Sequence, residues 1–141
     1  MTIEQDKISP IKTLAKAAAE HAYAPYSQFK VGAVLVTDTG EVIGGCNVEN
    51  VSYGLSNCAE RTAIFAAIAQ GLNPKSIKQV VIYTPSEKVY SPCGACRQVL
   101  AEFLNPETPV ISTCDNDFEQ WTVASLLPQA FHFDINEYRN S

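Results

Sequence analysis

Basic residues are scarce in this sequence, which has 10 lysines and arginines against 15 aspartates and glutamates and a formal net charge of -5. Proteins that bind DNA or RNA gather lysine and arginine against the phosphates, so this balance argues against a nucleic acid polymer as partner. Long apolar runs are also missing. Residues 1–9 lack the apolar core of a signal peptide, and no later stretch is long enough to span a membrane. We therefore expect a cytoplasmic protein that binds no membrane.

Internal repeats, low-complexity tracts and linkers are absent too, and 141 residues with 46% apolar side chains are enough for one domain with a buried core. We expect residues 1–141 to form that single domain. The chain has two histidines but five cysteines. In a reducing compartment, cysteines in this number are better explained by a metal site or by catalysis than by disulfide bonds.

Helical and strand patterns alternate through the middle of the chain. Helices are predicted over 9–21, 58–70, 94–104 and 122–127, and strands over 29–37, 42–48, 77–84 and 110–113. Ser9 and Pro10 resemble an N-cap followed by the first helical residue, and Gly71 stands where a helix C-terminus is commonly closed. Turn residues at 38–40 join two strands in a hairpin. The alternation predicts an α/β fold in which helices cover a sheet with parallel neighbours.

Three cysteines stand at the starts of two predicted helices. Cys58 opens one of them, and Cys93 and Cys96 lie three residues apart on one face at the start of the other. A helix N-terminus lowers the pKa of a thiol and so favours the thiolate that metals bind. Three thiolates suit zinc and leave its fourth position open, as catalytic sites do. The alternatives are a redox pair at Cys93 and Cys96, or a structural zinc module closed by His132 or Cys114.

Glu60 and two arginines accompany these cysteines. Glu60 falls in the first turn of the helix that Cys58 opens, where its carboxylate can face the open zinc position and exchange protons. An isolated acid in a first turn would more often only offset the positive end of the helix. Arg61 and Arg97 both follow ligand cysteines closely enough to donate hydrogen bonds to sulfur and offset the negative thiolates, and we favour Arg61.

Two strings, CAER at 58–61 and SPCGACRQ at 91–98, closely resemble the zinc-site motifs of the small, homotetrameric class of cytidine deaminases. Further matches follow at FKVGA (29–33), GCNVEN (45–50) and LLPQAF (126–131), so the resemblance spans roughly Tyr23 to Phe131. It implies a single three-layer α-β-α domain with a mixed central sheet. It also implies a homotetramer with one zinc ion per subunit.

The resemblance implies an enzyme that hydrolyses cytidine and deoxycytidine to uridine and deoxyuridine with release of ammonia, a step of pyrimidine salvage. Cys58, Cys93 and Cys96 would bind the zinc ion, which lowers the pKa of a water molecule. Glu60 would take the proton of that water and pass protons to ring N3 and to the departing amine as C4 is attacked. The partners would be a small nucleoside and the other subunits, with no organic cofactor.

Asn47 and Glu49 would bind the ribose 3′-hydroxyl by the same resemblance. Residues two apart on a strand face the same way, although alone such a pair would more often face solvent. A ribose contact favours a nucleoside over free cytosine, a nucleotide or a blasticidin-type antibiotic, whose deaminases share a related zinc site.

The resemblance also implies a pocket around the pyrimidine ring. Phe29 would pack against the ring together with Phe131 from a neighbouring subunit, and the backbone N–H of Ala59 would contact the 2-oxygen. Tyr53 would help to build the pocket wall, and Tyr26 is a weaker candidate for the same wall. Without the resemblance, these aromatic residues would be assigned to the apolar core.

Overall fold

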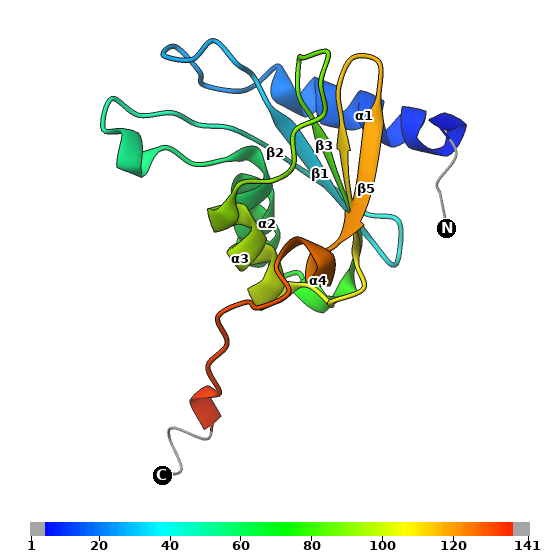
Figure 1. Cartoon of the computed structure of the whole chain (residues 1–141), viewed down its shortest axis with the longest axis vertical. Helices are drawn as coiled ribbons and strands as arrows, with labels where there is room; N and C mark the ends of the chain where they lie inside the picture. Colours follow the sequence, from blue (N-terminus) through cyan, green and yellow to red (C-terminus); the bar gives the residue numbers. More distant parts are fainter. Residues whose placement is uncertain (1–4, 137–141) are drawn as a thin grey trace.

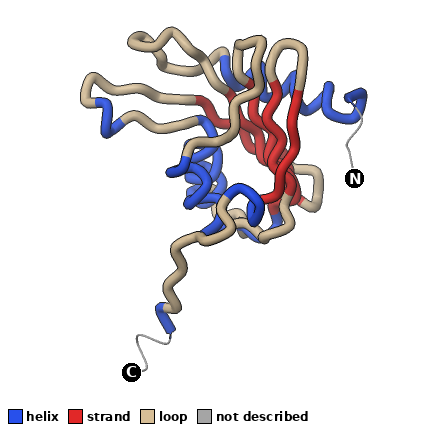
Figure 2. Tube along the Cα trace, in the orientation of Figure 1, coloured by secondary structure: helices blue, strands red, loops and turns tan. Residues whose placement is uncertain are grey.

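The computed structural model describes residues 5–136, with side chains from residue 8 onward, and centres on a five-stranded sheet in the order β2-β1-β3-β4-β5. The strands are β1 (Gly32–Thr37), β2 (Val42–Cys46), β3 (Ile77–Tyr83), β4 (Pro109–Thr113) and β5 (Phe118–Thr122). β3 and β4 run parallel, and every other neighbouring pair in this sheet is antiparallel. The sheet is therefore mixed (Figure 2), and the expected parallel pairing is limited to the strands that α3 connects.

Helices cover both faces of the sheet (Figure 1). They are α1 (Gln5–Ala19), α2 (Ala59–Ala69), α3 (Gly94–Phe103) and the short α4 (Val123–Leu126), with 3-10 turns η1 (Tyr53–Leu55) and η2 (Pro74–Ser76). Alternate residues of β1 face opposite ways: Ala33 and Leu35 pack in the core with α2 and α3, and Val34 packs with α1. The predicted three-layer α-β-α fold is confirmed. No helix in the described range 5–136 is long and apolar enough to cross a bilayer.

The start of α1 differs from the prediction. Ser9 and Pro10 do not begin the helix, which is already formed at Gln5 and carries Pro10 inside it. Ile8 is buried with Ala15 and Ala19 against Val34, and these positions share one helical face. Burial of Ile8 therefore draws the preceding turn into the helix, even though a proline removes one backbone hydrogen bond there.

α2 begins and ends as predicted. Cys58 is its N-cap, and Gly71 adopts a φ of 85° after its last turn. Gly71 N donates to Ile68 O at 3.0 Å and Leu72 N donates to Ala67 O at 3.0 Å. This pair of bonds is the Schellman arrangement, which satisfies carbonyls that a helix end leaves without partners.

β5 was not predicted. Its residues Glu119 and Gln120 are exposed and it forms one edge of the sheet, so the sequence there lacks a clear alternation of apolar and polar side chains. The strand pairs with β4 from Pro109 opposite Thr122 to Thr113 opposite Phe118. Thr122 then caps α4 in a capping box with Ser125, which explains why the final helix starts where expected.

Gly45 lets α2 lie directly on β2, and we expect Gly45→Ala to destabilise the fold. A Cβ at Gly45 would lie 2.4 Å from Ala63 N and 2.7 Å from Ala59 O, both in the backbone of α2. Backbone cannot move aside as a flexible side chain can, so the free energy of unfolding should fall by about 3 kcal/mol. Urea unfolding measures the change. Gly44→Ala is the matched control, since Gly44 precedes Gly45 in the same strand and a Cβ there would meet only Ala18 Cβ, at 3.6 Å, and an equal loss in both variants would contradict this packing.

Candidate active site

The N-termini of α2 and α3 bring three sulfur atoms together. Cys58 and Cys93 are the N-caps of the two helices, and Cys96 lies in the first turn of α3. The three Sγ atoms lie within 4.8 Å of one another, with 3.6 Å between those of Cys58 and Cys93. The cluster contains neither His132 nor Cys114, the residues considered for closing a structural zinc site.

The electrostatics of the cluster favour a bound cation. A hydrogen bond from the Cys96 thiol and a second from Arg61 lower the pKa of Cys58 to about 5, despite its half-burial. The same bond to Cys58, together with burial, raises the pKa of Cys96. Without a metal, therefore, one thiol ionises readily and a neighbour retains its proton. A cation is what allows all three to bind as thiolates.

These residues fit zinc by the chemistry of their donors. Three thiolates are soft ligands of the kind zinc accepts, and they leave a fourth position for water. Arg61 Nη2 donates to Cys58 Sγ at 3.3 Å. Its Nε is buried and has no hydrogen-bond partner among the described residues. The guanidinium therefore places positive charge beside sulfurs that would otherwise carry excess negative charge around the metal.

Glu60 is buried beside the sulfur cluster. It is 5% exposed, occupies the first turn of α2 next to the N-cap Cys58, and has a pKa raised chiefly by burial. Its own backbone N–H opposes that rise most, the nearby charge of Cys58 adds to it, and Cys96 and Arg61 oppose it further, so the pKa of the carboxyl depends on the cysteine cluster. A buried carboxyl with a raised pKa is suited to taking up and releasing a proton.

Arg97 has a different environment from Arg61. Its Nε donates to Pro92 O at 2.8 Å, Nη1 to Leu126 O at 2.9 Å and Nη2 to Ser91 Oγ at 2.8 Å. The guanidinium thus ties the loop before Cys93 to the end of α4. Of the two arginines that the sequence offers as sulfur partners, Arg61 makes the contact, and Arg97 holds the ligand loop in place.

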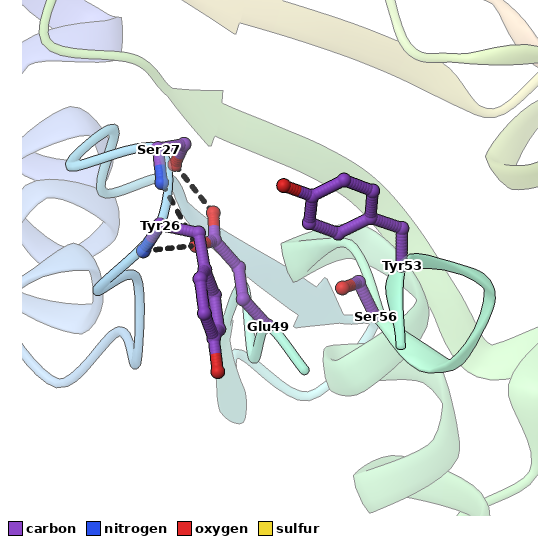
Figure 3. A pocket seen from close by; sticks show the side chains of 5 residues that line it. All are labelled: Tyr26, Ser27, Glu49, Tyr53 and Ser56. Carbon is purple, nitrogen blue, oxygen red and sulfur yellow. Dashed lines mark hydrogen bonds between the residues drawn. The ribbon is translucent and has the colours of Figure 1, made fainter. Parts of the chain in front are cut away.

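A cavity of about 340 Å³ opens near the start of β1 and is lined by Tyr26, Ser27, Glu49, Tyr53 and Ser56 (Figure 3). Tyr26, Ser27 and Glu49 form one side, and Tyr53 and Ser56 stand opposite. The rings of Tyr26 and Tyr53 meet edge to face with centroids 6.4 Å apart. Two tyrosine rings and one carboxylate form a surface suited to a ligand that has both a flat ring and hydroxyl groups.

Asn47 and Glu49 lie just beyond β2 rather than within a strand. Asn47 Nδ2 donates to Phe29 O at 2.9 Å, and its Oδ1 accepts from Val31 N at 2.9 Å. Between them, Val48 exchanges two backbone hydrogen bonds with Asn57, at 3.0 and 2.8 Å. Asn57 directly precedes Cys58, so this bridge brings the expected ribose-binding segment beside the sulfur cluster.

The remaining aromatic candidates are placed differently. Phe29 is partly buried and meets Tyr90 edge to face, with 6.3 Å between ring centroids. Phe131 is 75% exposed and is not among the residues that line the cavity of its own chain. The segment that follows α4 leads away from the body of the fold (Figure 1), and Phe131 belongs to this segment. The Gln98 amide binds the Phe131 backbone at both N–H and C=O, at 3.2 and 3.1 Å.

Comparison with known proteins decides the family. Residues 6–112 match the family model described as the cytidine and deoxycytidylate deaminase zinc-binding region. The chain belongs to this deaminase family. The matched range includes the three clustered cysteines, Glu60 and Arg61, so the sulfur cluster lies within the family's zinc-binding region.

Members of this deaminase family match the chain along most of its length. The cytidine deaminase of Sporosarcina psychrophila is 50% identical over 117 residues, 82% of this chain and 85% of the relative. That of Halalkalibacterium halodurans is 46% identical over 115 residues, 81% of this chain and 86% of the relative. A crystal structure of cytidine deaminase from Burkholderia pseudomallei matches with a TM-score of 0.84 at 47% identity, covering 92% of this chain and all of that one.

Sequence reasoning missed two groups that organise the deaminase site. Ser27 binds Glu49 through its hydroxyl and its N–H, and Gln98 holds the backbone of Phe131. Their signals in the sequence are weak, because Ser27 follows a proline and a tyrosine as many loop serines do, and Gln98 looks like an ordinary helix residue. Only the position of Gln98 within SPCGACRQ set it apart.

Proposed function

We propose that this chain is a zinc-dependent cytidine deaminase that hydrolyses cytidine and deoxycytidine to uridine and deoxyuridine in pyrimidine salvage. The observation that supports this proposal most strongly is the burial of Glu60 in the first turn of α2. The N-cap of that helix, Cys58, belongs to the three-sulfur cluster. The cytidine deaminases at 46% and 50% identity support the choice of substrate. We further propose that residues 1–141 act as one catalytic domain in the cytoplasm.

Cys58, Cys93 and Cys96 would hold one zinc ion per subunit, with Arg61 offsetting the thiolate charge. When bound there, zinc acts as a Lewis acid that makes water a nucleophile at neutral pH. Glu60 is the proton carrier of this proposal: it takes a proton from the water, passes it to N3 of cytosine, and delivers the next to the departing amine. The water oxygen bonds to C4 in the first step; in the second, its remaining proton reaches the amine through Glu60, so the C4–N bond breaks as the C4=O bond forms, and ammonia leaves.

The substrate subsites follow the same proposal. Glu49 lines the cavity and would accept a hydrogen bond from the ribose 3′-hydroxyl, with Asn47 beside it. Phe29 would lie against the pyrimidine, and Tyr53 would form part of the wall. Ala59 is the first residue of α2, where backbone N–H groups have no partner within the helix, so its N–H is available for the 2-oxygen of the ring.

A substrate panel tests the proposed function. Cytidine, deoxycytidine, cytosine, deoxycytidylate and a blasticidin-type antibiotic are each incubated with the purified protein, and products are separated by chromatography. We expect turnover of the two nucleosides at rates well above those of the other compounds. Turnover of the antibiotic or the free base alone would contradict the nucleoside assignment. Zinc binding without turnover of any compound would favour the structural zinc module.

We also propose that the active species is a homotetramer in which Phe131 completes the pocket of a neighbouring subunit. Val51, Tyr53 and Leu55 are 77%, 78% and 72% exposed, and they cluster around η1 at the rim of the cavity. Large apolar side chains gathered beside a pocket are typical of surfaces that another copy covers.

Measuring the mass of the active species tests the tetramer. Light scattering coupled to gel filtration should give four chains per particle, and dilution or mild denaturant that dissociates the particle should abolish turnover. Phe131→Ala should lower activity while leaving the mass unchanged, because the backbone bonds to Gln98 remain. A fully active monomer would contradict the assembly.

A further inference from the structure

Ser27 connects two residues that the proposed function assigns to substrate binding. Its hydroxyl donates a hydrogen bond to Glu49 Oε2 and accepts one from Phe29 N at 3.0 Å. Its own N–H donates to Glu49 Oε1 at 3.1 Å (Figure 3). One short side chain therefore fixes the position of Glu49 relative to the backbone that carries Phe29.

The hydrogen bonds to Glu49 leave a defined acceptor position. Oε1 accepts from the N–H groups of Tyr26 and Ser27, both at 3.1 Å, and Oε2 accepts from the Ser27 hydroxyl. An ionised carboxylate has about four acceptor sites, so one remains, on Oε2. Glu49 lines the cavity, and the Ser27 hydroxyl bond is the main cause of its lowered pKa. The carboxylate thus stays charged and presents one free acceptor position beside the cavity.

The loop that carries Ser27 is held in an unusual conformation. Gln28 has a φ of 58°, in the left-handed region that residues other than glycine rarely adopt, and its N–H donates to Ala24 O at 2.9 Å. Such a conformation persists only where surrounding contacts enforce it, and it is common at ligand-binding sites. Here it turns the chain so that Ser27 Oγ reaches both Glu49 and Phe29 N.

We propose that Ser27 is a positioning residue that sets selectivity for the ribose 3′-hydroxyl by fixing the Glu49 carboxylate against the Phe29 loop. The inference rests on the proposed function, since Glu49 is its ribose-binding group. Selectivity arises because a fixed carboxylate with one open acceptor position gains a hydrogen bond from a 3′-hydroxyl. A substrate that lacks this hydroxyl leaves the position unpaired.

The test compares cytidine with 3′-deoxycytidine in three variants. Ser27→Ala removes the hydroxyl, Ser27→Thr restores it, and Ser76→Ala is the matched control. The Ser76 hydroxyl donates to Asn73 O at 2.6 Å, and Ser76 directly precedes β3, at the end of the strands opposite the start of β1 and the cavity. Initial rates over a range of substrate concentration give kcat and KM separately, and thermal unfolding of each variant reports its stability.

We expect Ser27→Ala to lower kcat/KM for cytidine about tenfold, mainly through KM, because hydrogen bonds to charged groups are the stronger kind. For 3′-deoxycytidine the change should stay below about twofold, since that substrate makes no bond to the displaced carboxylate. Ser27→Thr and Ser76→Ala should match the wild type on both substrates. The ratio of the two kcat/KM values is the deciding quantity.

Equal losses on both substrates in Ser27→Ala would overturn the inference, because they would indicate a purely structural role. A wild type that deaminates both substrates equally well would overturn it too. A wild type that deaminates neither cytidine nor 3′-deoxycytidine would instead refute the proposed function on which the inference rests. The two failures are therefore distinguishable.

Discussion

Glu60→Gln is expected to abolish deamination while zinc stays bound. Glutamine matches the size of glutamate and suits a side chain that is 5% exposed, but its amide cannot accept a proton from water. General acid–base groups contribute up to about ten-thousandfold to rates, and this one serves several proton transfers, so kcat should fall by at least about a thousandfold. Single-turnover assays with uridine detection measure the rate, and metal analysis measures the zinc.

Glu102→Gln provides the matched control for Glu60. Glu102 lies exposed on α3, so the same chemical change there should leave both rate and zinc content as in the wild type. Wild-type turnover by Glu60→Gln would show that another group carries the protons. Loss of zinc from Glu60→Gln would contradict the proposed role, because it would show that the carboxylate supports the metal.

Cys96→Ser should remove zinc and activity together. Cys96 is fully buried in the first turn of α3, and its sulfur lies within 4.8 Å of the other two. Serine is a far weaker zinc ligand at neutral pH because its hydroxyl does not ionise there, and two thiolates hold the metal loosely. The zinc content should fall well below that of the wild type, and the thermal midpoint should fall as well, since a ligand of the native state stabilises it.

Cys114→Ser controls for the loss of a buried thiol as such. Cys114 is also fully buried, and its sulfur lies 3.5 to 3.6 Å from three oxygen acceptors that a serine hydroxyl can use. Zinc content and activity should therefore remain. If Cys114→Ser lost zinc and Cys96→Ser kept it, the three-sulfur cluster would not be the metal site.

Local signals in the sequence predicted the parts of the site that depend on helix ends. Cys58 and Cys93 are N-caps, and Gly71 closes α2, because capping is decided by a few neighbouring residues. Pro10 misled the prediction because the burial of Ile8, a tertiary contact, outweighed the local preference for a helix start at proline. β5 was missed because its residues do not alternate between apolar and polar. The strand forms through its pairing with β4, which is a tertiary contact.

The distinction between Arg61 and Arg97 shows where sequence reasoning ended. Both follow cysteines of the cluster closely, and spacing alone favoured neither strongly. In the fold, Arg61 Nη2 lies 3.3 Å from Cys58 Sγ, whereas all three donor groups of Arg97 bind Ser91, Pro92 and Leu126. Leu126 lies 29 residues from Arg97, so this contact depends on the packing of α4 against α3 and has no signal in the local sequence.

The most direct test of the central claim is the stoichiometry of products from cytidine. Purified protein, with zinc determined on the same sample, is incubated with cytidine, and uridine and ammonia are both quantified. We expect zinc in the preparation and equal amounts of uridine and ammonia, with turnover lost on chelation and restored by added zinc. A zinc-loaded protein that left cytidine and deoxycytidine unchanged would contradict it.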